Sequence, residues 1–498
     1  MDVAIALDHQ AKTPLHQQLY DELRQAILQG RLLPCQKLPS TRSIAQSLGI
    51  SRTTATQSYD RLQSEGYLET TVGSGTYVCA QLPDTLMQSI SVPLPAPSQS
   101  LTVPLSRYGA TLAQTPFTLQ PEPNLPISFR YGRPALTEFP LKLWRKLLSR
   151  RCCAEPGWLD YATDFQGYLP LRQAIAHYLC RSRAMQCQPE QIVLTNGTQQ
   201  GLDLIIRLFI EAGDAIAIED PGYLSARRIF QSHGAKLIPI PVDADGLVVE
   251  QLAHPAIRLV YVTPSHQFPT GATLSLPRRL ELLAWAQQTG ALILEDDYDS
   301  EYRYGDRPMP ALQGLDQAQS VLYLGTFSKV LFPALRIGYL VLPPNLVTLF
   351  AQAKWLHDRQ LPTLEQQVVT DFIVEGYLES HIRKMRSRYD RCRQVLVQEL
   401  NKQFGDQITI FGEKAGIHLM ARLQTRLSNE EVIERAAKVG VGLMSAQSQY
   451  LGSSGSGEFI FGYGELNETQ IQIGVQRLAQ AMVSDRALPI APEGVCKE

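Results

Sequence analysis

The sequence predicts two globular units, a small helical unit that ends in a β-hairpin and a larger α/β unit with a largely parallel sheet. Two short helical patterns separated by a glycine lie within residues 13–79. Strand-length apolar runs near residues 192, 215, 237, 258, 291 and 321 alternate with helical patterns, which is typical of a parallel sheet covered on both faces. The 498 residues are too many for one core. We expect units at 1–80 and 127–485, a linker at 81–126 and a tail at 486–498.

The composition is that of a globular protein, with 44% apolar residues, 19% charged residues and a formal net charge of −2. This balance does not by itself indicate a nucleic-acid or membrane partner. No apolar run is long enough to span a membrane and the N-terminus lacks the pattern of a secretion signal, so we expect a cytoplasmic protein. The eight cysteines are scattered without a Cys-x-x-Cys pair, which predicts neither a disulfide framework nor a metal site.

The first unit has the pattern of a helix-turn-helix. Apolar residues repeat at helical spacing over residues 15–28, and Gly30 ends that helix. Ser40 is the expected cap of a second helix, Gly49 turns the chain, and Ser51 is the expected cap of a third. In this motif the helix after the turn enters the major groove of DNA. A small protein-interaction module is the alternative, because helix pairs serve many uses.

A β-hairpin follows the third helix, with runs at 67–71 and 76–78 around a turn that contains Gly73 and Gly75. It would form a wing beside the helices. Between residues 37 and 61 the basic residues Lys37, Arg42, Arg52 and Arg61 oppose only Asp60, which gives +3, although residues 1–80 carry seven basic and seven acidic residues. Positive charge is therefore concentrated where DNA phosphates would lie.

This unit resembles the winged-helix domain of GntR-family transcriptional regulators. The resemblance rests on Leu38-Pro39-Ser40-Thr41-Arg42, Ser51-Arg52-Thr53-Thr54 and the glycine-rich wing, which stand in that order. It implies that the partner is a double-stranded DNA operator. It assigns DNA contact to Arg42, Ser51, Arg52, Thr53 and Thr54, with Gly73 and Gly75 at the tip of the wing.

The segment at 81–126 is rich in proline. The prolines stand among serine, glutamine and threonine without a helical or strand period, at positions 83, 93, 95, 97, 104, 116, 121, 123 and 126. Such a composition predicts a semi-extended linker that lets the two units move apart or reach a partner subunit. A passive tether is the alternative.

One lysine of the large unit is placed where chemistry is expected. The buried-strand pattern Val321–Leu324 leads into Gly325-Thr326-Phe327-Ser328-Lys329. In a partly dry pocket the ammonium form of a lysine is disfavoured, so its amine can condense with an aldehyde. Thr326, Ser328 and Arg336 are residue types that hold a phosphate. A surface lysine in a turn is the alternative.

Three earlier segments accompany this lysine. The strand pattern 291–294 ends in Glu295, Asp296 and Asp297, acids that could also bind a metal or cap a turn. After the strand pattern 192–195, Gly197 would let the backbone approach a ligand, and the amides of Thr198 and Gln199 would open a helix whose positive end faces a phosphate. An ordinary capped turn is the alternative there. The third segment is the turn Glu219-Asp220-Pro221-Gly222-Tyr223.

The four segments, in this order and spacing, resemble those of fold-type I aminotransferases. The resemblance implies that pyridoxal 5'-phosphate (PLP) is carried on Lys329 as a Schiff base. It implies that Asp296 keeps the pyridine nitrogen protonated, that Tyr298 bonds the phenolic oxygen and that Tyr223 stacks over the ring. It assigns the phosphate to Gly197, Thr198, Gln199, Thr326, Ser328 and Arg336.

A winged helix, a linker and an aminotransferase-like domain in one chain resemble the MocR type of GntR regulators. This resemblance implies that the large domain is a sensor derived from an enzyme and that the chain forms head-to-tail homodimers. We therefore expect a PLP-binding transcriptional regulator that senses PLP, or an amine or amino-acid effector, and controls DNA binding. A working aminotransferase with a DNA-binding appendage is the alternative, and a regulator with an empty site is a third.

Two departures from the aminotransferase pattern bear on catalysis. Phe268-Pro269-Thr270-Gly271 stands where aminotransferases commonly have Asn-Pro-Thr-Gly, so His266 or Gln267 is a candidate to replace the asparagine. Amino-acid aminotransferases also grip the substrate carboxylate with an arginine near the C-terminus, and the segment 458–463 contains none. Efficient catalysis needs such positioning, so we expect slow transamination at most.

Overall fold

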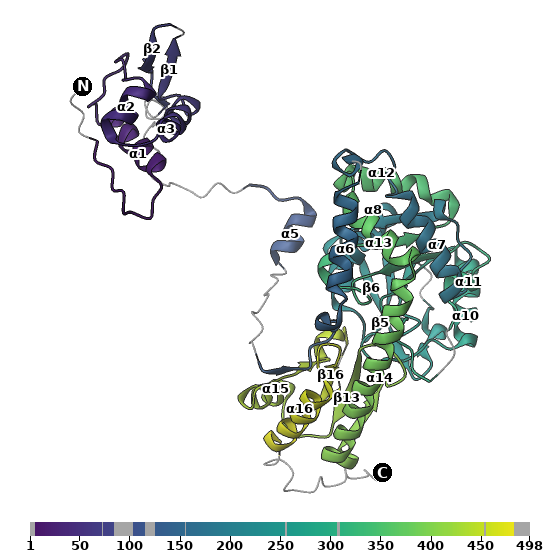
Figure 1. Cartoon of the computed structure of the whole chain (residues 1–498). Helices are drawn as coiled ribbons and strands as arrows, with labels where there is room; N and C mark the ends of the chain where they lie inside the picture. The colour runs from purple at the N-terminus through teal and green to yellow at the C-terminus, as the bar shows by residue number, and fades with distance from the viewer. Residues whose placement is uncertain are drawn as a thin grey trace, which may run out of the picture. The chain divides into compact units, whose positions relative to one another are not determined.

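The structure is a computed structural model that describes residues 5–71, 73–83, 103–114, 125–154, 156–253, 256–305, 309–452 and 455–482. The chain divides into two compact units, residues 1–104 and 105–498 (Figure 1). Much of the predicted linker and all of the predicted tail lie outside the described residues. One described part of that linker is a helix, α5 (Arg107–Gln114), which its composition did not predict. Within the described ranges no helix is long and apolar enough to cross a membrane.

The small unit is built on three helices, α1 (Leu15–Leu28), α2 (Thr41–Leu48) and α3 (Arg52–Ser64). As predicted, the hydroxyls of Ser40 and Ser51 accept the backbone N–H groups that open α2 and α3. Gly49 between these helices has a φ of 68°, a left-handed conformation that glycine adopts without strain. The apolar faces of the helices meet in one core that includes Leu19, Leu23, Ile44, Ala55, Tyr59 and Leu62.

The predicted wing is present as the strands β1 (Leu68–Thr71) and β2 (Gly75–Val78). They pair antiparallel, with Leu68 opposite Val78 and Thr71 opposite Gly75. Val78 and Leu68 are buried against the helices, so the base of the hairpin is anchored in the core of the unit. The turn between the strands is exposed at Gly73.

The large unit is organised on an eight-stranded sheet with the order β4-β11-β10-β9-β8-β5-β6-β7. Five neighbouring strands in the middle of this order, β10, β9, β8, β5 and β6, run parallel, as predicted. The strand β11 is antiparallel to both of its neighbours and was not predicted. The bounds are β4 (Ile192–Thr195), β5 (Ala215–Asp220), β6 (Lys236–Asp243), β7 (Gly246–Leu247), β8 (Ile257–Val262), β9 (Leu292–Asp297), β10 (Val321–Thr326) and β11 (Gly338–Val341).

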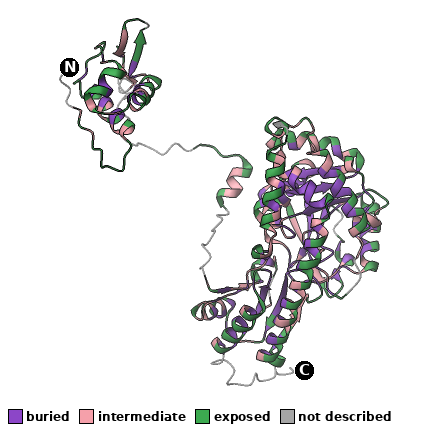
Figure 2. Cartoon of the chain, viewed as in Figure 1, coloured by how far each residue is buried: buried purple, intermediate pink, exposed green. Residues whose placement is uncertain are grey.

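Helices cover both faces of this sheet, and Figure 2 shows its strands as the most buried part of the unit. Along β10, Tyr323 packs with one group of helices, whereas its neighbours Leu322 and Leu324 pack with the other. That alternation explains why the central strands are apolar on both sides. The first group includes α6 (Leu141–Cys152), α7 (Leu169–Arg183) and α13 (Thr363–Val374); the second includes α8 (Gly197–Phe209), α9 (Leu224–Ser232) and α12 (Val347–Asp358). The helices α10 (Leu276–Thr289) and α11 (Leu312–Leu315) pack on a third cluster.

The remaining lobe begins with the long helix α14 (Tyr377–Phe404). An antiparallel sheet with the order β12-β13-β16-β15 packs against it. The short strand β3 (Ile127–Ser128) pairs in parallel with β14 (Val441–Gly442), so this early segment of the unit joins the lobe. The other bounds are β12 (Ile408–Phe411), β13 (His418–Leu423), β15 (Met444–Ser445), β16 (Glu458–Gly462), α15 (Asn429–Lys438) and α16 (Glu468–Ala481). This lobe combines helices and strands, whereas α12 and α13, which precede it in the sequence, pack on the large sheet.

The core of the large sheet gives a test of this architecture. Leu324 on β10 has no exposed surface, so Leu324→Ala should destabilise the large unit by about 2–5 kcal/mol through lost burial and a residual cavity. The matched change Leu280→Ala, at a side chain that is 52% exposed on α10, should alter stability by less than about 0.5 kcal/mol. Denaturant unfolding of the two variants measures the difference, and equal midpoints would contradict the assigned packing.

Candidate cofactor site and nucleic-acid interface

A cavity of about 280 Å³ opens in the large unit where β9 and β10 end and α8 begins. These elements bring together segments that are far apart in the sequence. Of the residues assigned to the cofactor, all but Gly197 line this cavity: Thr198, Gln199, Tyr223, Asp296, Tyr298, Thr326, Ser328, Lys329 and Arg336. Gly197 lies directly behind Arg336 at the same end of the cavity.

Lys329 reaches the cavity from the loop after β10. Its Nζ donates a hydrogen bond of 2.7 Å to the carbonyl of Gly132. Burial lowers the pKa of this amine, and the nearby carboxylates of Asp299 and Asp296 partly oppose that effect. The result agrees with the partly dry pocket expected from the sequence, and it leaves the amine more available for condensation with an aldehyde.

Asp296 ends β9 and presents its carboxylate to the cavity. Its Oδ2 accepts a hydrogen bond of 2.7 Å from the Tyr261 hydroxyl. Its Oδ1 is buried and has no hydrogen-bond partner among the described residues. Burial raises the pKa of this carboxyl to about 7. A protonated pyridine nitrogen would supply both the missing donor and a compensating charge, so the site fits the ring of PLP.

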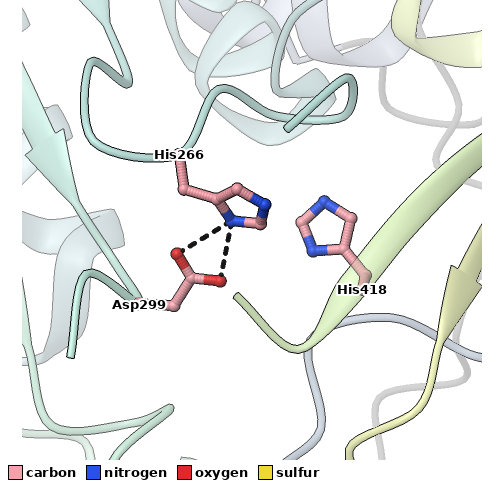
Figure 3. A group of neighbouring side chains, drawn as sticks. All are labelled: His266, Asp299 and His418. Atoms are coloured by element: carbon pink, nitrogen blue, oxygen red, sulfur yellow. Dashed lines mark hydrogen bonds and ion pairs between the residues drawn. The ribbon is translucent and has the colours of Figure 1, made fainter. Parts of the chain in front are cut away.

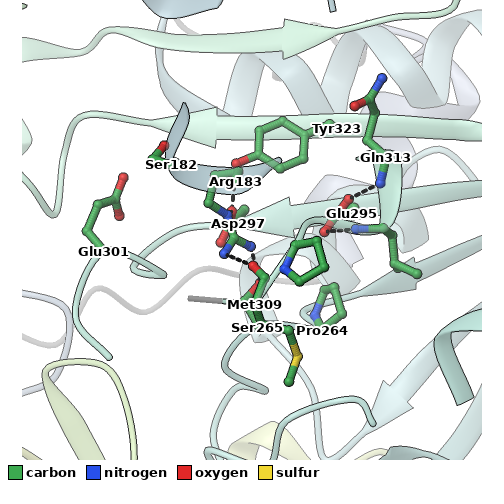
Figure 4. Close-up of polar contacts among 12 residues, drawn as sticks. Ser182, Arg183, Pro264, Ser265, Glu295, Asp297, Glu301, Met309, Gln313 and Tyr323 are labelled. Carbon is green, nitrogen blue, oxygen red and sulfur yellow. Dashed lines mark hydrogen bonds and ion pairs between the residues drawn. The ribbon is translucent and has the colours of Figure 1, made fainter. Parts of the chain in front are cut away.

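The two acids beside Asp296 face other parts of the protein (Figure 4). Glu295 accepts hydrogen bonds from the backbone N–H groups of Leu312 and Gln313 at the start of α11. One member of the acidic cluster therefore caps a helical turn. Asp297 forms a buried ion pair of 2.9 Å with Arg183 and accepts the Tyr323 hydroxyl at 2.6 Å. Consecutive side chains of a strand point to opposite sides, so Glu295 and Asp297 point away from the side that Asp296 presents to the cavity.

The opposite end of the cavity is suited to a phosphate. The helix α8 begins at Gly197 without a side-chain cap, so its first backbone N–H groups are available to an anion. The Thr326 hydroxyl donates to Ser328 Oγ at 3.0 Å, and Arg336 Nη2 donates to the Asn196 carbonyl at 3.1 Å. A Cβ built on Gly197 would lie 2.5 Å from Arg336 Nη2. Glycine is favoured there because its φ is 69° and because the guanidinium approaches the backbone.

The aromatic residues assigned to the ring lie at the cavity wall. Tyr223 stands just before α9 and meets Phe268 edge to face at 5.7 Å between ring centroids. The Tyr298 hydroxyl donates to the His266 carbonyl at 2.9 Å. Its oxygen still has lone pairs that can accept a further hydrogen bond.

The two candidates for the missing asparagine are used within the protein. Gln267 donates from its side-chain amide to the carbonyls of Pro221 and Phe268 at 2.8 and 2.7 Å. His266 contacts the Asp299 carboxylate. Neither is among the described residues that line the cavity, whereas Thr263 and His418 are. Burial holds the pKa of His418 well below its usual range.

Several residues at or beside the site were not identified from the sequence, among them Tyr261, Thr263, His418 and Asp299. Tyr261, Thr263 and His418 lie within apolar strands or at their ends, where the pattern indicates core positions. Asp299 follows the acidic cluster, but no spacing signal separates it from a surface acid. No arginine was assigned to a substrate carboxylate from the sequence. Among the described residues that line the cavity, Arg336 is the one arginine.

The residues assigned to DNA contact lie at the start of α3, on α2 and in the wing. Arg42, Arg52 and Thr53 are exposed. Ser51 and Thr54 hydrogen-bond to each other at 2.8 Å in the cap of α3. Gly73 and Gly75 have φ values of 78° and 126°, which place the wing turn in conformations that favour glycine.

Arg61, one of the four basic residues in the positive stretch, is bound within the unit. It pairs with Glu65 at 3.0 Å and its guanidinium lies 4.0 Å from the centre of the Tyr20 ring. The side chain of Arg61 is still 47% exposed, but Glu65 offsets its charge. Lys37, Arg42 and Arg52 are the other exposed basic residues of this stretch.

Comparison with known proteins covers both units. Residues 15–78 match the family of bacterial regulatory proteins, gntR family, and residues 137–454 match aminotransferase class I and II. The chain is 39% identical to the probable rhizopine catabolism regulatory protein MocR of Rhizobium meliloti, over 98% of this chain and all of that protein. It is 32% identical to the pyridoxine biosynthesis transcriptional regulator PdxR of Corynebacterium glutamicum, over 97% of this chain and 99% of that protein.

The large unit also has solved structural neighbours. A kynurenine aminotransferase of Pyrococcus horikoshii superposes with a TM-score of 0.68 and 28% identity, over 77% of this chain and 96% of that one. The fold-type I architecture expected from the four motif segments is thus confirmed. The chain therefore belongs to the GntR family as a MocR-type member, a transcriptional regulator in which a winged helix-turn-helix is joined to a PLP-dependent aminotransferase-like domain.

Proposed function

We propose that this regulator holds PLP on Lys329 and that the occupancy or chemical state of this site sets its affinity for an operator in the cytoplasm. The observation that carries the proposal is the pairing of a lysine of lowered pKa with a buried carboxylate oxygen that has no partner in the described structure. When bound, PLP supplies an aldehyde that reacts with primary amines and a ring that accepts electrons.

Each part of the cavity has a role in this proposal. Lys329 holds the cofactor at the end of β10, and Asp296 stabilises the protonated ring nitrogen. Arg336 and the N-terminus of α8 hold the phosphate by charge and backbone N–H groups. Tyr223 and Phe268 exclude water from the faces of the ring.

Sensing is favoured over efficient turnover by the charges of the cavity. Arg336 lies at the phosphate end, and the described lining offers no second arginine for a substrate carboxylate. A ligand amine can still reach Lys329, but its position would be weakly fixed, and fast transamination requires a fixed position. The effector is then PLP itself or an amine that reacts with it. One relative is named for pyridoxine biosynthesis, which supports PLP as a signal.

Coupling requires that PLP or an amine binds one arrangement of the two units more tightly than another. We propose head-to-tail homodimers as the setting for this change. Large apolar side chains exposed on the large unit support an association surface, among them Leu159 at 69%, Tyr161 at 68% and Leu356 at 78% exposure.

Replacing the lysine tests the central assignment. Lys329→Ala should abolish the visible absorption that PLP gains on a lysine, and it should remove any effect of PLP on DNA affinity. Lys142→Ala, at an exposed position of α6, is the matched control and should keep both. Absorption spectra and gel shifts with and without PLP measure the two properties. A Lys329→Ala spectrum equal to that of the native protein would refute the assignment.

The carboxylate that would face the ring nitrogen is tested by an isosteric change. Asp296→Asn keeps the size of the side chain but removes its charge, so it should weaken retention of PLP by about tenfold or more, as expected for loss of a charged hydrogen bond. Asp245→Asn, at an exposed turn, should leave retention unchanged. Dialysis followed by PLP quantification gives the comparison. Equal retention in both variants would mean that Asp296 does not contact the ring.

Arg52 tests the DNA interface. Arg52→Ala should weaken binding to a DNA fragment selected in vitro with the native protein by about tenfold, because a groove or phosphate contact is lost. Arg31→Ala, which removes an exposed arginine in the loop after α1, should have little effect. If gel shifts give the same affinity for Arg52→Ala and the native protein, Arg52 lies outside the interface.

A further inference from the structure

Two buried histidines and an aspartate meet beside the cofactor cavity (Figure 3). His266 comes from the loop after β8, Asp299 follows β9, and His418 opens β13. Their exposed fractions are 1%, 1% and 2%. The imidazole rings face each other with centroids 4.7 Å apart, and Asp299 lies behind His266. His418 also lines the cavity.

The hydrogen bonds of the rings determine which nitrogens carry protons. His266 Nδ1 lies 3.0 and 3.1 Å from the two carboxylate oxygens of Asp299. The Tyr298 hydroxyl also lies 3.1 Å from this nitrogen, but it donates to the His266 carbonyl at 2.9 Å. A carboxylate only accepts, so His266 Nδ1 is the donor. His418 makes a backbone hydrogen bond with Pro269, whose backbone offers only a carbonyl. Since His418 Nε2 has no partner, its donor is also Nδ1.

In its neutral form each ring therefore carries a lone pair on Nε2. Within the described structure neither Nε2 atom has a hydrogen-bond partner, although both are buried. Leaving two buried acceptors unsatisfied costs free energy. The gap between the rings therefore favours a species that accepts electron pairs from both.

This pattern is typical of histidines that bind metals. A metal-binding histidine usually donates its other ring N–H to a carboxylate or to a backbone carbonyl, which fixes the tautomer. Here Asp299 provides the carboxylate and Pro269 provides the carbonyl. One ligand atom from each of His266, Asp299 and His418 can be chosen so that all three lie within 4.8 Å of one another.

We propose that His266 and His418 bind a divalent transition-metal ion of the zinc class through their Nε2 atoms, with Asp299 orienting His266. Imidazole ligands suit zinc, copper and nickel more than calcium or magnesium. With two imidazole ligands the ion would keep open positions, which water or a ligand in the cavity can occupy. The site would thus place a Lewis acid at the wall of the effector cavity. The prediction of no metal site rested on cysteine spacing, which gives no information on these histidines.

Metal binding by the full-length protein tests the proposal directly. After treatment with a chelator, equilibrium dialysis with Zn²⁺ should give one tightly held ion per chain. Co²⁺, a spectroscopic substitute for Zn²⁺, should produce visible ligand-field bands in difference spectra against the metal-free protein. Zn²⁺ should then displace the Co²⁺ bands.

Variants locate the ion. His266→Phe and His418→Phe should each lower metal affinity at least tenfold and remove the Co²⁺ bands. Asp299→Asn should weaken binding by about 10- to 100-fold, the usual effect of changing a residue that orients a ligand. His177→Phe, at an exposed position of α7, is the matched control and should bind as the native protein does.

Folding of the variants is checked separately by thermal unfolding and by circular dichroism. If His418→Phe does not fold, His418→Gln replaces it, with the same expected loss of metal. Failure of the native protein to retain about one ion per chain would overturn the proposal. So would binding that persists in both histidine variants, or thiolate absorption in the Co²⁺ spectrum, because the ion would then lie elsewhere. None of these three results depends on whether PLP controls DNA affinity.

Discussion

The parallel pairing of β9 with β10 is the constraint on which the cofactor site depends. Leu324 is paired with Asp296 and Gly325 with Asp297, so the acids that end one strand lie beside the loop that carries Lys329. Parallel strands end at the same edge of a sheet, and ligands of α/β proteins bind at that edge. Hydrogen bonds between backbones, rather than any contact of the lysine itself, bring Lys329 and Asp296 to one cavity.

Burial of charge gives this edge its chemistry. Burial raises the pKa of Glu219, Glu295 and Asp296 to about 7 in each case. Glu219 and Glu295 are stabilised by hydrogen bonds from neighbouring groups, whereas Asp296 keeps one buried oxygen without a partner in the described structure. A protein tolerates such a group where a ligand completes it. An unsatisfied oxygen does not by itself identify a binding carboxylate, because Asp297 Oδ1 is also buried without a partner in the described structure. Asp296 is distinguished because its side chain also lines the cavity.

The same site explains why an enzyme fold can serve regulation. The cavity has residues suited to the phosphate and to the ring of the cofactor. Its described lining has no second arginine for a substrate carboxylate. Under the proposed function, the contacts that hold the cofactor are kept, whereas fast reaction would also require a group that fixes the substrate carboxylate. Such a domain would respond to occupancy of the site. The winged helix keeps its exposed arginines on a separate core, so DNA contact and cofactor contact involve different units.

The sequence alone determined the order of units, the caps at Ser40 and Ser51, the parallel strands and nine of the residues that line the cavity. These features depend on a local residue pattern, or on a motif in which a strand and the turn after it are adjacent in the sequence. The tertiary structure alone decided the antiparallel β11, the contact of Tyr261 with Asp296, and the meeting of His266 with Asp299 and His418. Those contacts join segments from different strands, and a buried tyrosine or histidine in an apolar run has the same local pattern whether it fills the core or faces a ligand. Burial and hydrogen bonding distinguish the two cases, and both are properties of the folded chain.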